Sequence, residues 1–128
     1  MKIASIALLM SGVSSGAWAQ DTIKEDIAKD YDYLSSLFEY FHEHPELSFK
    51  ETETAKRLGQ ELGALGFKVT LGVGQTGLVA MMTNGPGPTV LVRADMDGLP
   101  VKEDTGLSYA STARQVNING IEMPVMHA

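Results

Sequence analysis

The sequence predicts an α/β fold in which two helices come first and a mostly β segment follows. Two apolar runs with helical spacing occupy residues 22–66, and short apolar runs separated by glycine-rich turns occupy residues 67–94. The chain has 128 residues, 44% of them hydrophobic, which suits one small hydrophobic core. We therefore expect a sheet that is layered against helices.

The first helix is expected to begin at Thr22 and to end before Pro45. Its apolar positions recur every three or four residues, as on one face of an amphipathic helix: Ile23, Ile27, Tyr31, Leu34, Phe38 and Phe41. The pattern ends at His44, because a residue that precedes proline disfavours the helical conformation.

The second helix is expected to open at Ser48, which can form a capping box with Glu51. Glu53 can pair with Arg57 one turn further on, and Gly66 is expected to end the helix. The buried face of this helix carries three leucines: Leu58, Leu62 and Leu65.

Strand signals follow at residues 67–71, 77–83 and 89–94, and the segments QVNI and IEMPV flank Asn119-Gly120, a strong hairpin signal. Between the first two strands, GVGQTG matches the G-x-G-x-x-G pattern of dinucleotide-binding sites. Such a site requires a helix to begin at the glycines, whereas the strand-like LVAMMT follows here. We therefore interpret these glycines as a turn between strands.

Residues 1–20, MKIASIALLMSGVSSGAWAQ, have the lysine, the short apolar run and the Ala-Trp-Ala ending of a secretory signal peptide. A transmembrane anchor is the alternative, but a bilayer-spanning helix needs about 20 apolar residues. We predict a signal peptide over residues 1–19, cleavage after Ala19, and a secreted or periplasmic mature protein that is not held in a membrane. Disulfides cannot stabilise this exported chain, because it has no cysteine.

The charge balance argues against nucleic acid as a partner. Sixteen acidic residues against ten basic ones give a formal net charge of −6, and no Lys/Arg cluster is longer than Lys56-Arg57. The sequence therefore lacks the basic surface that binds a phosphate backbone.

Asp95 and Asp97, at the end of the third predicted strand, are the candidate site residues. Residues two apart in a strand point to the same side, and ligands bind at the carboxyl ends of strands in open α/β sheets. We expect the preceding Val90–Val92 to be buried, so that the strand carries both acids to one point. Carboxylates placed in this way bind a divalent metal or orient a histidine that does, whereas a single Asp there commonly serves as a turn or cap residue.

The three histidines give weaker evidence for a metal site than the two aspartates do. His42 and His44 lie two residues apart at a helix end, where they face different directions, so capping or packing is expected rather than a shared metal. With no cysteine and only one further histidine, His127, the chain cannot assemble a closed transition-metal site.

Four motifs occur in order along the chain: HPELSFKETETAKRLGQELGALGFKV, TGLVA, VLVRADMDGLPVKEDTGLSYAS and MPVMHA. Together they resemble the opening third of the aminoacylase and hippurate hydrolase-like amidohydrolases, which include the auxin-conjugate hydrolases, within metallopeptidase family twenty. The resemblance runs from about His42 to Ala128, with Gly98 where the family has Ala and a longer hairpin between Ser111 and Met126.

This resemblance implies that residues 20–128 are the N-terminal portion of a three-layer α/β/α catalytic domain. It implies a metal-dependent amidohydrolase that cleaves the amide bond of N-acyl amino acids or similar conjugates, with Zn²⁺ or Mn²⁺ as cofactor. The metal ligands are expected beyond Ala128, so no residue of this chain is expected to bind the metal, and the chain alone is expected to be inactive. A smaller inserted domain, also outside this chain, can form a homodimer.

The resemblance also implies roles for three residues. Asp97 matches an acid that supports catalysis beside the metal centre without binding the metal. Asp95 falls where related peptidases place a metal-binding histidine, but this subfamily has Asp there, so Asp95 is expected near the metal site rather than as a ligand. His127 matches a histidine that neighbours the metal centre. The alternative function is a small exported module that holds a hard cation such as Ca²⁺ on Asp95 and Asp97, although no spaced acidic loop supplies the six or more oxygen ligands that Ca²⁺ takes.

Overall fold

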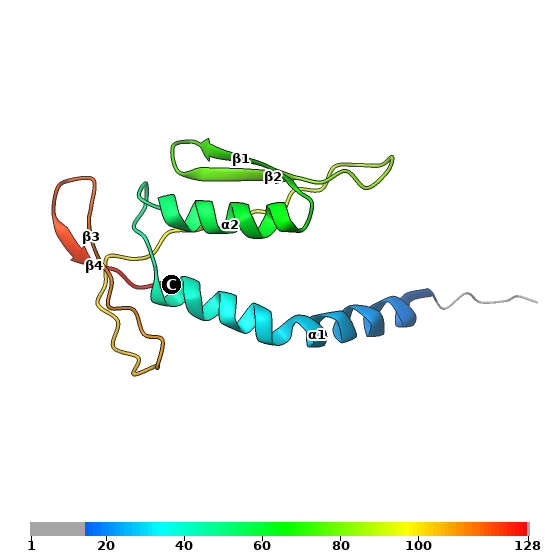
Figure 1. The fold of residues 1–128 in the computed structure, drawn as a ribbon, viewed down its shortest axis with the longest axis horizontal. Helices are drawn as coiled ribbons and strands as arrows, with labels where there is room; N and C mark the ends of the chain where they lie inside the picture. Colours follow the sequence, from blue (N-terminus) through cyan, green and yellow to red (C-terminus); the bar gives the residue numbers. More distant parts are fainter. Residues whose placement is uncertain (1–14, 128) are drawn as a thin grey trace, which may run out of the picture. The chain divides into compact units, whose positions relative to one another are not determined.

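The computed structural model describes residues 15–127, with side chains from Thr22 onward. Its elements, in chain order, are helices α1 (Ser15–Glu43) and α2 (Thr52–Ala64) and strands β1 (Lys68–Val73), β2 (Gly77–Met81), β3 (Arg114–Val116) and β4 (Glu122–Pro124) (Figure 1). The two compact units of the chain meet between Ser35 and Ser36, within α1. The order of two helices followed by short strands is the predicted one.

The predicted lysine and apolar run of the signal peptide lie outside the described residues, so the signal peptide stays a prediction. Helix α1 begins at Ser15, earlier than expected, and ends at Glu43, as expected from Pro45. Within the part of the chain that the structure describes, no helix is both long and apolar enough to cross a membrane.

The apolar face of α1 is only partly covered. Phe41 is half-buried, whereas the other five predicted positions are exposed: Ile23, Ile27, Tyr31, Leu34 and Phe38. Helical periodicity therefore located the helix correctly, but residues 15–127 do not bury the whole of its apolar face.

The N-terminus of α2 differs from the prediction. The helix begins at Thr52, and its N-cap residue Glu51 makes no side-chain capping bond. Instead, the Glu46 carboxylate accepts a hydrogen bond from the backbone N–H of Thr54 at 2.7 Å. The capping-box prediction is wrong because Ser48 and Glu51 bind partners from distant segments, and Glu46 satisfies the helix terminus from outside.

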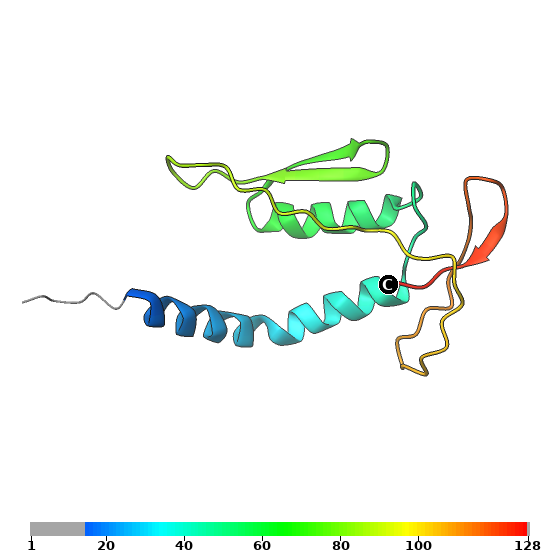
Figure 2. The ribbon, with the colours of Figure 1, turned by 180° about the vertical axis from the view of Figure 1, so that it is seen from behind.

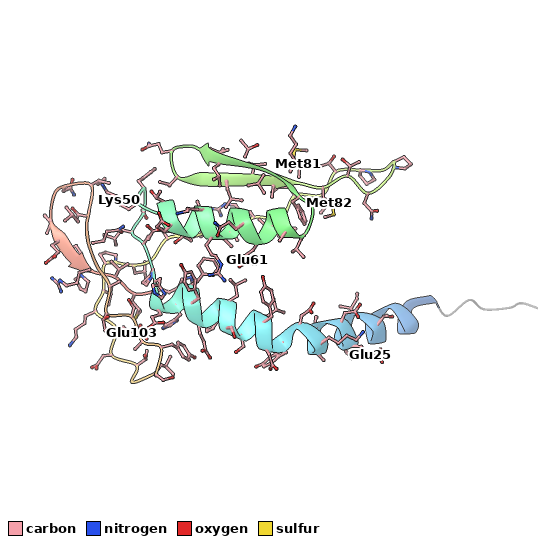
Figure 3. All side chains as sticks on the ribbon, viewed as in Figure 1. Glu25, Lys50, Glu61, Met81, Met82 and Glu103 are labelled. Carbon is pink, nitrogen blue, oxygen red and sulfur yellow. The ribbon has the colours of Figure 1, made fainter. Side chains whose placement is uncertain are left out.

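The C-terminus of α2 is as predicted. Phe67 N–H donates to the Leu62 carbonyl and Gly66 N–H donates to the Gly63 carbonyl, both at 3.0 Å, which is the bonding pattern of a glycine-terminated helix. On the helix surface, Arg57 pairs at 2.6 Å with Glu61, which Figure 3 labels, rather than with Glu53.

Strands β1 and β2, both near their predicted positions, form an antiparallel hairpin, and α2 packs along it (Figure 2). GVGQTG forms the turn between them, which confirms its interpretation as a turn. The chain is crowded there: a Cβ on Gly77 would lie 2.5 Å from the carbonyl oxygen of Val73. In α2, a Cβ on Gly59 would lie 3.1 Å from the Leu71 side chain and 3.4 Å from that of Val69, so helix and hairpin pack closely there.

The predicted strand at residues 89–94 is absent from the described structure. Val90, Leu91 and Val92 are 80%, 84% and 91% exposed, so the prediction that they are buried is wrong here. A continuous apolar run is typical of a strand that has neighbours on both edges and layers on both faces. Residues 15–127 supply neither neighbouring strands nor covering layers for this segment, and residues 89–94 pair with no strand among the described residues.

Strands β3 and β4 confirm the hairpin predicted at Asn119-Gly120. Asn117 closes it: its N–H donates to the Ile121 carbonyl at 2.9 Å, and its side-chain oxygen accepts from the N–H groups of Asn119 and Ile121. The loop is three residues long rather than two, because Asn117 and Ile121 extend the pairing beyond the strands.

Three segments meet where two of the buried apolar side chains, Leu47 and Val125, lie. Leu47 bridges Gly98 in parallel, and Leu99 bridges Met126 in antiparallel orientation. Leu47 and Val125 are 5% and 1% exposed. We call this meeting of residues 45–47, 97–99 and 125–127 the three-segment junction; it positions the candidate site residues described next.

Candidate functional site

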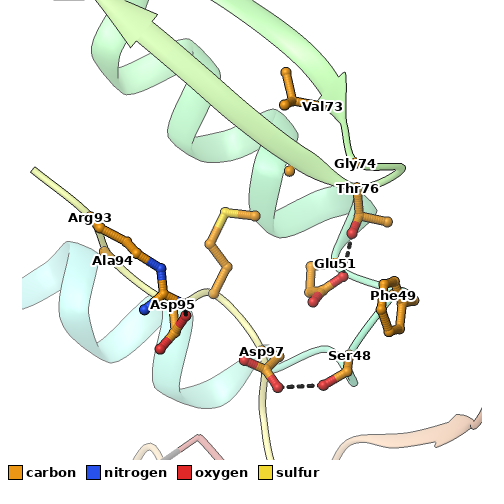
Figure 4. A pocket seen from close by; sticks show the side chains of 12 residues that line it. Ser48, Phe49, Glu51, Val73, Gly74, Thr76, Arg93, Ala94, Asp95 and Asp97 are labelled. Carbon is orange, nitrogen blue, oxygen red and sulfur yellow. Dashed lines mark hydrogen bonds and ion pairs between the residues drawn. The ribbon is translucent and has the colours of Figure 1, made fainter. Parts of the chain in front are cut away.

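A pocket of about 390 Å³ lies where the segment after α1, the β1–β2 turn and residues 93–97 come together (Figure 4). Three carboxylates are among its lining side chains, so we call it the acidic pocket. Its polar lining residues are Ser48, Glu51, Thr76, Arg93, Asp95 and Asp97. Both predicted aspartates therefore lie at one pocket, as the sequence suggested.

Asp97 is the better fixed of the two. Its side chain is half-buried, and its Oδ2 accepts a hydrogen bond from the Ser48 hydroxyl. The next residue, Gly98, donates its N–H to the Glu46 carbonyl at 2.6 Å. Side chain and backbone are thus both tied to the segment that follows α1.

Asp95 is held much more loosely. It pairs with Arg93 at 2.5 Å, with side chains 69% and 76% exposed. Exposed ion pairs of this kind contribute about 0–1 kcal/mol. Figure 4 shows Asp95 turned toward Arg93 and Asp97 turned toward Ser48. The expectation that a strand directs both carboxylates to one point is therefore corrected: they line one pocket but serve different partners.

Glu51 is a third carboxylate of the acidic pocket, and its sequence position predicted only helix capping. It is 9% exposed and accepts a hydrogen bond from the Thr76 hydroxyl at 2.6 Å. This bond ties the start of α2 to the β1–β2 turn. No local sequence pattern predicts the Thr76–Glu51 hydrogen bond, because the two residues are 25 positions apart.

His127 lies at the three-segment junction, directly after Met126. Met126 and Leu99 exchange two backbone hydrogen bonds, at 2.7 and 3.0 Å, so His127 is carried to the segment that holds Asp97. The His127 ring lies 6.2 Å from the His42 ring, centroid to centroid. The structure thus brings the segments that carry Asp97 and His127 together, while the roles that the resemblance implies for them stay predictions.

A second cluster of polar groups surrounds Glu103, which the sequence analysis did not single out. Its side chain is fully buried, and Oε1 lies 2.8 Å from His42 Nε2. The Thr105 hydroxyl donates to the same oxygen, and the Ser111 N–H donates to Oε2 at 2.6 Å. The hydrogen bonds from His42 and Thr105 lower the pKa of Glu103 from 4.5 to about 2, against the opposing effect of burial.

His44 has the capping role expected of it. Its Nδ1 lies 2.8 Å from the Tyr40 carbonyl oxygen at the end of α1, and its ring stacks on the Tyr40 ring at 4.6 Å. His42, by contrast, packs among aromatic rings and pairs with Glu103. The two histidines do face different directions, as their spacing predicted.

Within residues 15–127, no group of three or more His, Asp or Glu side chains is placed to hold a metal ion. The carboxylates of the acidic pocket are bonded to hydroxyl or guanidinium partners instead. The described residues therefore do not fit a divalent ion on their own, either as a transition-metal site or as a hard-cation site.

The chain is similar to known proteins in both sequence and structure. No protein-family model matches the chain. A thermostable carboxypeptidase of Saccharolobus solfataricus is 40% identical over 98 residues, which are 75% of this chain and 25% of that protein. An IAA-amino acid hydrolase of Arabidopsis thaliana, ILR1-like 2, is 35% identical over 115 residues, 83% of this chain and 26% of that protein.

Among solved structures, the chain is similar to a Bacillus subtilis protein described as a dinuclear metal binding peptidase from the M20 family. The TM-score is 0.64 at 31% identity, over 78% of this chain and 26% of the other. The chain spans about a quarter of the length of the curated relatives that it matches.

Proposed function

We propose that this chain takes part in metal-dependent hydrolysis of amide bonds. It matches about a quarter of the length of a carboxypeptidase and an IAA-amino acid hydrolase in sequence, and of an M20-family peptidase in fold. The resemblance and the α/β fold class inferred from the sequence are thus confirmed. The observation that carries the proposal is the joint agreement of fold and sequence with a dinuclear metal binding peptidase, at a TM-score of 0.64 and 31% identity.

In this proposal the acidic pocket forms one wall of the catalytic site of the whole protein. Asp97 is the supporting acid: Ser48 and the Gly98 backbone bond hold it in place, so it can orient a neighbouring ligand without large reorganisation. Asp95 and His127 lie close to this wall without coordinating the metal. The support for these roles is the shared pocket of the two acids and the Leu99–Met126 pairing that carries His127 to it.

A divalent ion, for which we propose Zn²⁺ or Mn²⁺, would supply a water of lowered pKa and polarise the amide carbonyl. Residues 15–127 hold no group of three or more side chains placed for a metal ion, and the family resemblance supports ligands that lie outside the described residues. The 128-residue chain is accordingly expected to be inactive on its own.

For the substrate we propose an N-acyl amino acid or a short peptide-like conjugate. The relatives named as a carboxypeptidase and as an IAA-amino acid hydrolase support this, since both names denote the hydrolysis of an amino acid from an amide linkage. The signal-peptide pattern over residues 1–19 supports an exported protein, and the family resemblance supports a homodimer formed by a domain outside this chain.

The test is hydrolysis of a panel of N-acyl amino acids and dipeptides by the whole protein, with and without a chelator. We expect release of free amino acid that EDTA abolishes and that added Zn²⁺ or Mn²⁺ restores, and we expect none from the 128-residue chain. Failure of the whole protein to cleave any member of the panel, with either ion present, would contradict the proposal.

A further inference from the structure

The His42–Glu103 pair has no part in the function proposed above, yet it is among the most enclosed polar contacts that the structure describes. The side chains are 12% and 0% exposed, and they join the end of α1 to the loop before β3 (Figure 3). Burying an ionisable pair is costly unless its geometry and further hydrogen bonds compensate. Here Thr105 and Ser111 supply those further bonds.

Glu103 determines which nitrogen of His42 carries a proton. With its pKa at about 2, Glu103 is ionised near neutral pH and can only accept hydrogen bonds. His42 Nε2, at 2.8 Å from Oε1, must therefore be the donor. The bond fixes both the protonated nitrogen and the plane of the imidazole ring.

The ring fixed in this way contacts three others. Tyr109 meets it edge-on at 5.2 Å, Phe38 lies at 5.9 Å, and His127 lies at 6.2 Å with an interplanar angle of 33°. Figures 1 and 2 both show the red segment that follows β4 running to the end of α1, in agreement with the His42–His127 contact. His127 is thus held from two sides, by the His42 ring and by the backbone pairing of Met126 with Leu99.

We propose that Glu103 is a positioning residue: it orients His42, and the His42 ring in turn fixes the His127 ring beside the segment that carries Asp97. The proposal rests on the proposed function only in treating this neighbourhood as the wall of the catalytic site. Its physical content is an ordered contact between two imidazole rings, which is measurable without any hydrolysis.

The experiment is NMR of the 128-residue chain with ¹³C- and ¹⁵N-labelled histidine. In the unchanged chain we expect His42 to be protonated on Nε2 and an NOE between the ring protons of His42 and His127. Glu103→Gln keeps the shape of the side chain but removes its charge, so we expect the NOE to be lost and the His127 ring signals to move. Glu122→Gln is the matched control, because Glu122 is exposed in β4 and its carboxylate pairs with Arg114 at the surface, away from His42.

His42→Gln separates positioning from a purely structural role. The glutamine amide can still donate to Glu103, so the loop should keep its fold and the Ser111 N–H its exchange protection, while the ring contact is gone. Deleting the His42 ring changes the His127 shifts in any case, so the readout is the order of the His127 ring. Positioning predicts that the NOEs from the His127 ring to the neighbouring Leu99 segment weaken in both variants while the Ser111 N–H keeps its exchange protection, whereas a purely structural role predicts that the NOEs and the protection are lost together. Unchanged His127 NOEs in both folded variants would overturn the proposal. A missing His42–His127 NOE in the unchanged chain would also overturn it, and this observation does not depend on whether a variant folds.

A negative hydrolysis assay would leave these NMR results unaffected. Conversely, absence of the His42–His127 ring contact would not contradict metal-dependent hydrolysis by the whole protein, which the hydrolysis assay tests. The two proposals therefore fail separately.

Discussion

The Ser48 hydroxyl donates a hydrogen bond to Asp97 across 49 positions of sequence, and this bond joins the segment after α1 to the wall of the acidic pocket. Ser48 is thereby withdrawn from the helix-capping role that its position in the sequence suggested. The same bond makes Asp97 the best fixed of the two predicted aspartates.

Asp97→Asn is expected to lower kcat/KM of the whole protein about 10- to 100-fold, the usual effect of losing a carboxylate that orients a metal ligand. Ser48→Ala should act in the same direction and more weakly, because it loosens the carboxylate without removing it. Initial rates on an N-acyl amino acid at saturating metal provide the measurement. Asp104→Asn, at an exposed position, is the control and should leave kcat/KM unchanged.

Glu46→Ala is expected to cost about 1 kcal/mol of unfolding free energy, since a lost helix N-cap typically costs 0.5–2 kcal/mol. Glu46 accepts the Thr54 N–H at 2.7 Å, and no other side chain caps α2 in the described structure. Urea unfolding followed by circular dichroism measures the change. Glu122→Ala, which removes an exposed carboxylate, should shift the same free energy by less than about 0.5 kcal/mol; equal effects of the two substitutions would argue against the cap.

The stability of the chain in acid should depend on Glu103. Its pKa is lowered to about 2 in the folded chain, so its contribution is fully present above the ordinary value of 4.5 and is lost as pH falls toward 2. Glu103→Gln should therefore flatten the decline of unfolding free energy between about pH 4.5 and 2. Glu122→Gln should keep the decline of the unchanged chain, and a decline that is identical in all three proteins would refute the assignment.

Two glycine-to-alanine substitutions should change the stability of the chain in opposite directions. Gly77→Ala places a Cβ 2.5 Å from the Val73 carbonyl oxygen and should destabilise the chain by about 1–3 kcal/mol. Gly63→Ala, in α2, meets no atom within 4 Å and should stabilise it by about 0.5–1 kcal/mol through helix propensity. Thermal melts of the two variants side by side suffice, and a stabilising Gly77→Ala would show that the turn is roomier than described.

Features governed by local chemistry were predictable from the sequence. Pro45 ends α1, Gly66 ends α2, and Asn119-Gly120 forms the turn of the β3–β4 hairpin, because each depends on residues only a few positions away. The relation between Asp95 and Asp97 was predictable only in part. Both line the acidic pocket, but they diverge because residues 89–94 lack the neighbouring strands that would hold them in a regular pleat.

Features governed by distant partners were not predictable. Glu103 reads as an ordinary surface acid in the sequence, and only the fold shows that it is buried against His42, 61 positions away. Ser48 and Glu51 have the spacing of a capping box. In the structure, however, Ser48 donates a hydrogen bond to Asp97, and Glu51 accepts one from Thr76. Sequence rules for neighbouring residues cannot decide between a local hydrogen bond and one to a distant residue, because the free energy of each bond depends on how deeply its groups are buried.

The three-segment junction has a consequence for the order in which the chain folds. The β1–β2 hairpin, α2 and the β3–β4 hairpin close short loops, whereas the Leu47–Gly98 and Leu99–Met126 bridges close long ones and carry a larger entropic penalty. Crowding at Gly98, where a Cβ would lie 2.8 Å from the Val125 side chain, leaves little room for partial assembly. We therefore expect the hairpins to gain amide protection first during refolding and the junction, with the pocket wall that it supports, to gain it last.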